Sequence, residues 1–300
     1  MRKLNFDFMG KRFWFLGFSA LLMVLSIGAL GVRGLEFGIE FQGGTVITFI
    51  DTEGVTTDEM RDAFEAQDVS SAQIQSTESG GFIVRTTEAD PDIANDVYQA
   101  VIEDLALSNQ AGDVTTIGPG WGRNITNAAL LALLLSVTAI LFYTSLRFEY
   151  KMAGAAVAAL IHDIVLTLGV YALLGRELTP NTIAALLAIM GYSIYDTIVV
   201  FHRMRENSQR LVKQTFMSMA NDSINQVFMR SLNTSLTSLI PPLVMLFFGG
   251  ETLKDFAFAL VIGLLAGAYS SIGVASPIYA MWKEREPKFQ ALKKRYANMS

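Results

Sequence analysis

Apolar residues along the chain gather in six long blocks separated by polar segments. An α-helix needs about 20 mostly apolar residues to cross the roughly 30 Å hydrocarbon core of a bilayer, and each block is close to that length. The first block follows basic residues, as a signal peptide would, but its apolar run is longer than a signal requires and five more blocks follow. We therefore expect six membrane-spanning helices, at residues 13–33, 125–146, 152–174, 181–202, 232–249 and 255–282, the last five forming a bundle over 123–282.

The polar segment 34–122 has the pattern of a small α+β domain. Thr56 and Glu59 are spaced as the capping box that opens a helix, and after Pro91 apolar residues recur every four positions, which predicts a second helix. Runs that are rich in β-branched residues, or in which apolar and polar residues alternate, predict strands at 38–50, 72–77, 81–87 and 113–118. The order βαββαβ is that of a ferredoxin-like unit, whose helices cover one face of the sheet and leave the other for a partner domain.

Composition supports a membrane protein that is not an enzyme. Only 17% of the residues are charged, and the mean hydropathy is +0.37. The chain has no cysteine and two histidines, which argues against disulfides, thiolate chemistry and a histidine-based metal site. The pair Gly43-Gly44 is not a phosphate loop, because no Gly-Lys-Ser/Thr follows and no helix opens there. We expect a β-bulge or a close backbone approach at this pair, and no cofactor.

Basic residues predict the orientation. If the N-terminus is cytoplasmic, the segments 1–12, 203–230 and 283–300 and the loop after the second helix lie inside and hold 17 of the 23 Lys and Arg residues. The exterior segment 34–122 then holds 17 acidic residues and two basic ones. This imbalance disfavours binding to nucleic acid or anionic lipid by the exterior domain. Both termini are therefore expected in the cytoplasm, and residues 283–300 are expected to form a basic tail there.

Two carboxylates, Asp163 and Asp196, lie within the predicted spans away from their ends. A carboxylate at the centre of a membrane helix costs about 2.5–3.5 kcal/mol on insertion scales, so such residues are functional candidates. Asp196 lies six residues before His202, about 9 Å from the cytoplasmic end of its helix. Because consecutive spans run antiparallel, the two carboxylates could approach each other.

A proton relay is one interpretation of these acids. Loss of water disfavours the charged form of a carboxyl group, and a neighbouring cation favours it. A carboxyl group under both influences changes between its charged and neutral forms after only a small movement or the entry of water. Arg230, at the cytoplasmic end of the fifth span, is the candidate cation. The structural alternative is that each acid only joins helices by hydrogen bonds. Further candidates for relay or helix packing are His162, Tyr195, His202, Thr234 and Thr237.

Several stretches together resemble the SecF family, the smaller subunits of bacterial SecD–SecF membrane complexes. They are FDFMGKRFWFLGFSALLM (6–23), GIEFQGGT (38–45), LIHDIVLTLG (160–169), GYSIYDTIVVFHRMREN (191–207) and INQVFMRSLNTSLTSL (224–239). The resemblance implies a fold of the resistance-nodulation-division (RND) type in the bacterial plasma membrane. It also implies a SecD-like partner, the SecYEG channel, YidC as a further partner, and use of the proton motive force to draw unfolded polypeptide outward.

The resemblance also assigns residues. The essential carboxylate of the family falls on Asp196, its essential arginine on Arg230, and another recurring acid on Asp163. Tyr195 and His202 stand where many relatives have Asn and Asp, which leaves a relay role for His202, and the choice between H⁺ and Na⁺ as coupling ion, open.

Three rival functions remain beside this one. The first, an intramembrane aspartyl protease, would need a second carboxylate in a Gly-x-Gly-Asp setting, and Ile161-His162 precede Asp163 instead. The second is an RND-type exporter of small molecules, and the third is a scaffold subunit whose acids do not titrate.

Overall fold

The computed structural model describes residues 6–296 except 51, 53, 70–71, 78–79, 89, 108–111, 212–213 and 250. The chain divides into two compact units. One comprises Met1–Glu36 and Ala132–Ser300, and the other is Phe37–Leu131.

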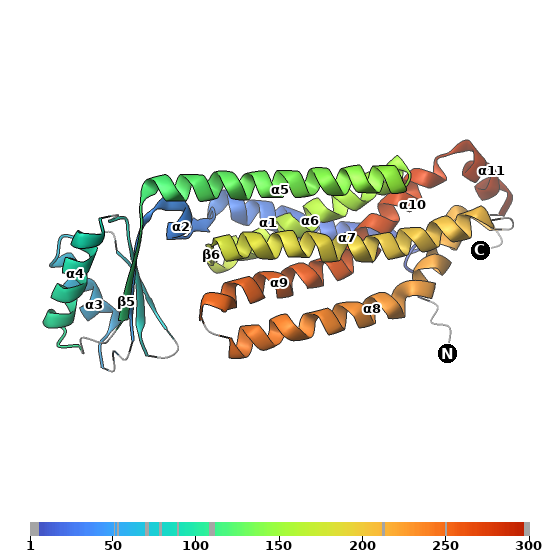
Figure 1. Ribbon diagram of the computed structural model, residues 1–300. Coiled ribbons are helices and arrows are strands. Elements are labelled where there is room, and N and C mark those ends of the chain that lie inside the picture. The colour runs from blue at the N-terminus through green and yellow to red at the C-terminus, as the bar shows by residue number, and fades with distance from the viewer. Residues whose placement is uncertain are drawn as a thin grey trace. The chain divides into compact units, whose positions relative to one another are not determined.

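Six helical segments among the described residues are long and apolar enough to cross a membrane. The first five are α1 (Arg12–Val32), α5 (Pro119–Arg147), α6 (Tyr150–Leu174), α7 (Pro180–Gln209) and α8 (Phe216–Phe248) (Figure 1). The sixth is built of α9 (Glu251–Ser270), a single π-helical turn η1 (Ser271–Ala275) and α10 (Ser276–Glu284), and a short helix α11 (Pro287–Tyr296) follows. Two very short strands, β1 (Glu36–Phe37) and β6 (Glu177–Leu178), complete the elements near the spans.

The ends of these helices differ from the sequence prediction. Residues 203–230 were expected to form a loop, yet α7 continues to Gln209 and α8 already begins at Phe216. Thr215 caps α8, because its hydroxyl accepts a 3.1 Å hydrogen bond from the backbone N–H of Ser218. The predicted boundaries followed hydrophobicity, whereas the helical backbone continues beyond the apolar stretches of α7 and α8.

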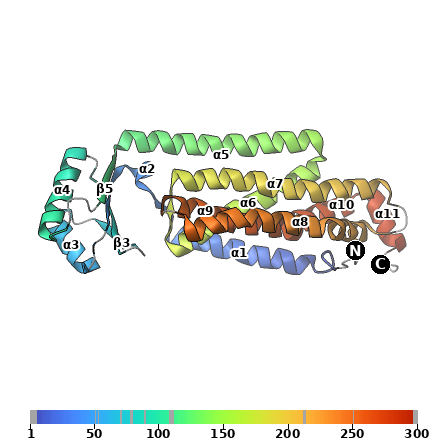
Figure 2. The same cartoon turned by 60° about the horizontal axis from the view of Figure 1, so that its bottom comes forward.

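Close packing in the membrane unit depends on small residues. α9 packs against both α7 and α8, and α1 packs against α6 (Figures 1 and 2). At the contact of α9 with α7, a Cβ on Gly263 would lie 2.2 Å from Cδ1 of Ile189, and one on Gly267 would lie 3.0 Å from Cβ of Ser193. The two glycines therefore let α9 approach α7, as expected for small residues in membrane helix contacts.

The unit Phe37–Leu131 contains a four-stranded antiparallel sheet with strand order β3-β4-β2-β5. Along the chain its elements are β2 (Gly44–Phe49), α3 (Thr57–Glu65), β3 (Gln73–Ser76), β4 (Phe82–Thr86), α4 (Pro91–Asp104) and β5 (Gly112–Ile117). Both helices cover the same face of the sheet (Figure 1) and bury Phe49, Phe64 and Val101 against it.

Local predictions in this unit have mixed outcomes. The capping box is confirmed: Thr56 accepts from the backbone N–H of Glu59, whose side chain accepts from the N–H of Thr56. Residues 38–50 are not one strand, because Ile39–Gln42 forms a short helix α2 that ends at Gly43. Strands β3 and β4 correspond to the predicted strands 72–77 and 81–87 and pair with each other in antiparallel fashion, and residues 78–79 between them lie outside the described residues.

The pair Gly43-Gly44 makes a close backbone approach, as predicted. Gly44 has φ of +127°, and a Cβ there would lie 2.3 Å from the carbonyl oxygen of Thr86 on β4. Only glycine has access to this conformation without strain, and only glycine leaves room for the neighbouring strand.

Candidate functional site

Asp196 lies on α7 and is 8% exposed. The hydroxyl of Ser235 on α8 donates a 3.2 Å hydrogen bond to its Oδ2 atom. The same carboxylate lines a cavity of about 20 Å³, which Tyr195, Ser193 and Thr234 also line. A polar cavity of at least roughly 10–15 Å³ can hold one water molecule, so Asp196 has room for a single exchangeable partner.

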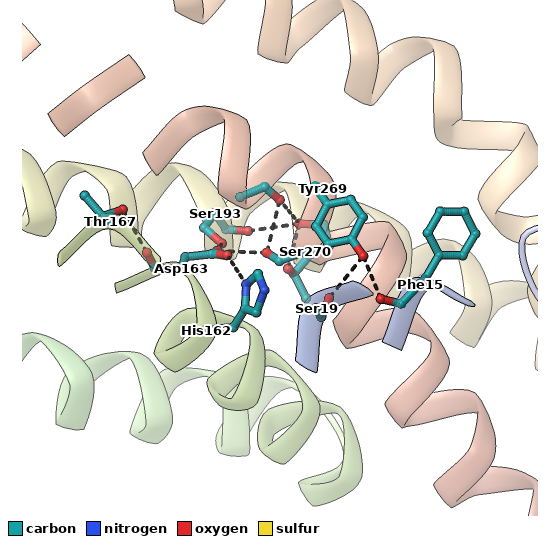
Figure 3. A network of polar contacts seen from close by, with 11 residues as sticks. Phe15, Ser19, His162, Asp163, Thr167, Ser193, Tyr269 and Ser270 are labelled. Atoms are coloured by element: carbon teal, nitrogen blue, oxygen red, sulfur yellow. Dashed lines mark hydrogen bonds and ion pairs between the residues drawn. The ribbon is translucent and has the colours of Figure 1, made fainter. Parts of the chain in front are cut away.

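Asp163 on α6 is 1% exposed and has a different environment. Its Oδ2 atom accepts hydrogen bonds from the hydroxyls of Ser193 on α7, at 2.6 Å, and Ser270 on α9, at 2.8 Å. Its Oδ1 atom lies 3.0 Å from Nδ1 of His162 (Figure 3). Both carboxylate oxygens are therefore occupied, and the acid joins three spans.

The two carboxylates do not contact each other directly, but Ser193 relates them. Its hydroxyl bonds to Asp163, and its side chain lines the cavity beside Asp196. Ser193 and Asp196 are three residues apart on α7, so they share one face and lie about 4.5 Å apart along the helix axis. The expected approach of the two acids is thus an indirect one, through a serine.

Hydroxyl groups extend this network around the π-helical turn. The Ser271 hydroxyl lies 3.0 Å from that of Thr197 on α7 and donates to the carbonyl of Gly267 at 2.9 Å. The Ser276 hydroxyl donates to the carbonyl of Ser271 at 2.7 Å. A π-turn departs from the regular i→i−4 hydrogen bonding, and such turns are frequent at functional sites. Here serine hydroxyls bond to carbonyls at and beside the turn.

The network reaches α1 through Tyr269 on α9. The Tyr269 hydroxyl donates to the carbonyl of Phe15 at 2.7 Å and accepts from the hydroxyl of Ser19 at 3.1 Å (Figure 3). The rings of Tyr269 and His162 lie 6.2 Å apart. Nε2 of His162 is buried and has no hydrogen-bond partner among the described residues.

Arg230 does not pair with Asp196 in this structure. Its side chain is exposed, and no ion pair or hydrogen bond joins its guanidinium to any residue in the described part of the chain. The Arg230 carbonyl accepts a 2.9 Å hydrogen bond from the hydroxyl of Thr234. Since Thr234 lines the cavity and lies four residues on, Arg230 lies one helical turn from the cavity on the same side of α8.

The remaining candidates are spread over the same helices. Tyr195 is half exposed and lines the cavity, whereas His202 is exposed, about two turns further along α7. Thr237 is exposed, is not among the residues that line the cavity, and bonds to carbonyls of its own helix. The structure therefore places Tyr195 and Thr234 near Asp196, His162 beside Asp163, and neither His202 nor Thr237 at either acid.

Sequence reasoning missed Ser193 and Ser270, the hydroxyl donors to Asp163. Two weak signals were present. Ser193 lies three residues before Asp196, and Ser270-Ser271 form a polar pair inside an otherwise apolar span. The described residues hold no cluster of three or more His, Cys, Asp or Glu side chains that could bind a metal ion.

Comparison with known proteins gives consistent matches. Residues 97–285 match the family model described as the C-terminal part of the protein export membrane proteins SecD/SecF, and residues 28–49 match the SecD/SecF GG motif. The chain is 38% identical to protein translocase subunit SecF of Streptomyces coelicolor over 98% of this chain and 81% of the relative. It is 34% identical to the SecF subunit of Petrotoga mobilis, over 95% of this chain and 99% of the relative.

The solved structures that this chain resembles belong to a longer protein. The crystal structure of SecDF from Thermus thermophilus matches with a TM-score of 0.87 and 34% identity, over 94% of this chain and 39% of that one. SecDF in a super-membrane-facing form matches with a TM-score of 0.68 over 97% of this chain and 40% of that one. The chain therefore spans about 40% of the length of SecDF. The extent of these matches shows that the chain, a multi-pass membrane protein, belongs to the SecD/SecF family of protein export membrane proteins.

Proposed function

We propose that this chain acts in Sec-dependent protein export as the SecF-type half of a complex with a SecD-like subunit. A relative from Thermus thermophilus carries the name SecDF, and this chain matches 40% of its length. We further propose that the complex works beside SecYEG and YidC, and that the proton motive force drives it to draw unfolded polypeptide out of the channel.

The observation that carries the ion-coupling proposal is the contrast between the two buried acids. A carboxylate offers about four acceptor positions on its two oxygens. Asp196 accepts a hydrogen bond from Ser235 and borders a water-sized cavity. Asp163 accepts from two serine hydroxyls on one oxygen, and its other oxygen lies 3.0 Å from Nδ1 of His162. We assign proton exchange to Asp196, and to Asp163 the positioning of α7 and α9.

Arg230 fits the role of a cation that reaches Asp196 in another state of the cycle. It lies one turn from the cavity-lining Thr234 and has no ion pair among the described residues, so moving it breaks no described salt bridge. A guanidinium that swings toward Asp196 would favour the charged carboxylate and release its proton, and its departure would favour uptake. Tyr195, at the cavity wall, and His202, toward the helix end, are the candidate groups along the path.

We also propose the arrangement across the membrane. The unit Phe37–Leu131 would be a ferredoxin-like domain outside the plasma membrane, with both chain termini in the cytoplasm. The strand order β3-β4-β2-β5, with two helices on one face, supports the fold assignment. The placement of 17 of the 23 basic residues supports the orientation.

The test compares matched variants in membrane vesicles that contain the complex with a SecD-like subunit and SecYEG. Asp196→Asn keeps the size of the side chain and its ability to accept from Ser235, but it cannot titrate. We expect export driven by the proton gradient to fall to the level seen without a gradient. Thr237→Val, on the exposed side of α8, is the control and should export normally.

Normal gradient-driven export by an assembled Asp196→Asn complex would refute ion coupling at this residue and favour a scaffold role. The coupling ion is identified in the same vesicles. Export that survives collapse of the proton gradient but follows an imposed sodium gradient would assign Na⁺ in place of H⁺.

A further inference from the structure

A cavity of about 450 Å³ lies where the first turn of α1, the first turn of α8, the end of α10 and helix α11 meet. Four basic side chains line it: Arg12, Arg285, Lys293 and Lys294. All belong to the segments that the distribution of Lys and Arg assigns to the cytoplasm. The cavity is therefore a concentration of positive charge at the end of the membrane spans.

Acidic side chains do not neutralise this charge. Glu284 is the one acid that lines the cavity, and it accepts a 2.8 Å hydrogen bond from Lys293. Within the described part of the chain, Arg285 and Lys294 have no ion pair. Nε of Arg12 is buried without a hydrogen-bond partner among those residues, although Nη1 of the same side chain donates to the carbonyl of Met9 at 2.8 Å. The cavity thus presents unused donors and a net positive charge.

Neighbouring charges show that this is not a general property of the helix end. Lys283 bonds to both Glu149 and Glu286, and Lys151 bonds to Glu286 at 2.8 Å. These four residues form ion pairs with one another. Lys283 and Glu286 lie within two positions of Arg285 along the chain, yet Arg285 has no such pair among the described residues. Acidic partners are therefore present at this helix end, and Arg285 and Lys294 of the cavity pair with none of them in the described part of the chain.

The rest of the cavity wall is mostly apolar, with Gln290 at its exposed rim. Phe13, Met217 and Met281 line it, and Phe13 is 66% exposed on the first turn of the first span. A ligand that suits the whole cavity has an anionic head and an apolar body. A free anion would use the basic wall and leave the apolar wall without a function.

We propose that this cavity binds the headgroup of an anionic phospholipid. The phosphodiester would accept from the guanidinium groups of Arg12 and Arg285 and from Lys294, since guanidinium groups bind phosphate oxygens in pairs. The acyl chains would lie along Phe13. Basic pockets between membrane helices on the cytoplasmic side are suited to such headgroups. The site would anchor the ends of α1, α8 and α10 to the inner leaflet, independently of any ion coupling.

Native mass spectrometry of the purified full chain in detergent tests this, with phosphatidylglycerol or phosphatidylcholine added at equal concentration. The double variant Arg285→Gln/Lys294→Gln removes two cavity charges. The matched control Lys288→Gln/Arg295→Gln removes the same charge from the same stretch outside the cavity. We expect about tenfold weaker retention of phosphatidylglycerol in the first and little change in the control. Gln290→Glu, which adds a negative charge at the exposed rim, should also weaken it.

Three outcomes would overturn the proposal. Equal losses in the cavity variant and the control would mean that only net charge matters. Equal retention of phosphatidylcholine by the unmodified chain would mean that the headgroup charge is not recognised. Displacement of the lipid by millimolar inorganic phosphate would assign the site to a free anion.

Discussion

The hydroxyl of Ser193 donates a 2.6 Å hydrogen bond to Oδ2 of Asp163, across the contact between α7 and α6. Ser270 on α9 donates to the same oxygen, so one carboxylate oxygen holds three membrane spans in register. Ser193 also lines the cavity beside Asp196. A rearrangement at Asp196 that moves this turn of α7 would therefore strain the bond to Asp163. This gives the proposed exchange site a physical connection to the rest of the bundle.

Replacing Ser193 with Ala should destabilise the membrane unit. The variant leaves Asp163 with one fewer donor in a site that is 1% exposed, so we expect a loss of about 1–2 kcal/mol, near the upper end for hydrogen bonds between membrane helices. Thermal unfolding of the purified protein in detergent measures it. Thr138→Val is the control, because that exposed hydroxyl bonds only to the carbonyl of Leu134 on its own helix. Equal effects of the two changes would show that the contact with Asp163 contributes nothing.

Gly263→Ala should also destabilise the bundle, by overpacking. The new Cβ would lie 2.2 Å from Cδ1 of Ile189, whose side chain is buried and cannot move into solvent. We expect a cost of about 1–3 kcal/mol in the same unfolding measurement. Adding Ile189→Ala should recover part of it, because the atoms that overlap are removed. Gly28→Ala is the control, since nothing lies within 4 Å of its Cβ, and it should be neutral or slightly stabilising. A similar loss in both glycine variants would contradict close packing at Gly263.

Hydrophobic pattern predicted the number of spans because the bilayer imposes one length on every crossing segment. It could not predict that α7 and α8 extend beyond their apolar stretches, since helix continuation there depends on backbone hydrogen bonds and on a cap at Thr215. Capping at Thr56 was predictable because it needs only residues three positions apart. The short helix Ile39–Gln42 was not predictable, because its apolar and polar residues alternate as they do in a strand.

Of the candidate site, the sequence predicted only the residue type that is rare in apolar segments, the carboxylates. A carboxylate in an apolar block is conspicuous, so Asp163 and Asp196 could be found from the chain alone. Serine is common in membrane helices, and nothing in the sequence says which serine faces a carboxylate on another helix. Ser193 and Ser270 therefore needed the packing of α6, α7 and α9. Likewise, the separation of Arg230 from Asp196 depends on side-chain conformation, which residue order does not specify.

Gly44→Ala should disrupt the pairing of β2 with β4. Alanine would adopt φ of +127° with strain of about 1–3 kcal/mol, and its Cβ would overlap the carbonyl oxygen of Thr86. Gly54→Ala is a matched control, because it has φ of +91° but nothing within 4 Å of its Cβ. Hydrogen exchange of the full chain, followed by mass spectrometry, should show faster exchange in residues 82–86 for Gly44→Ala only. Equal exchange in both variants would mean that the close approach does not hold the strands.

Stability in mild acid should depend on Glu286, which lies just outside the last span. Burial acts to raise the pKa of Glu286, but hydrogen bonds from Lys151 and Lys283 outweigh it and hold the pKa below its ordinary value of 4.5. A carboxyl group whose pKa is lower in the folded state stabilises the fold above the unfolded value, and this stabilisation disappears as the pH falls through the folded value. The contribution of Glu286 is thus complete at neutral pH and lost below about pH 4.5.

Glu286→Gln should therefore lower the free energy of unfolding at pH 7 by about 1–3 kcal/mol, since the Lys151 side chain, only 9% exposed, loses its charged partner. The difference in free energy of unfolding between the variant and the unmodified chain should narrow as the pH is lowered below 4.5. The reason is that the Glu286 carboxyl group of the unmodified chain then also becomes neutral. Glu206→Gln, which removes a partner of Arg203 in a pair with both side chains over one third exposed, should cost less than about 1 kcal/mol. Unfolding curves recorded from pH 7 to about pH 3, which covers the range below 4.5, measure the free energy of unfolding of all three proteins. A gap for Glu286→Gln that stays constant over this range would mean that the side chain acts through its shape and hydrogen bonds, and its charge contributes nothing.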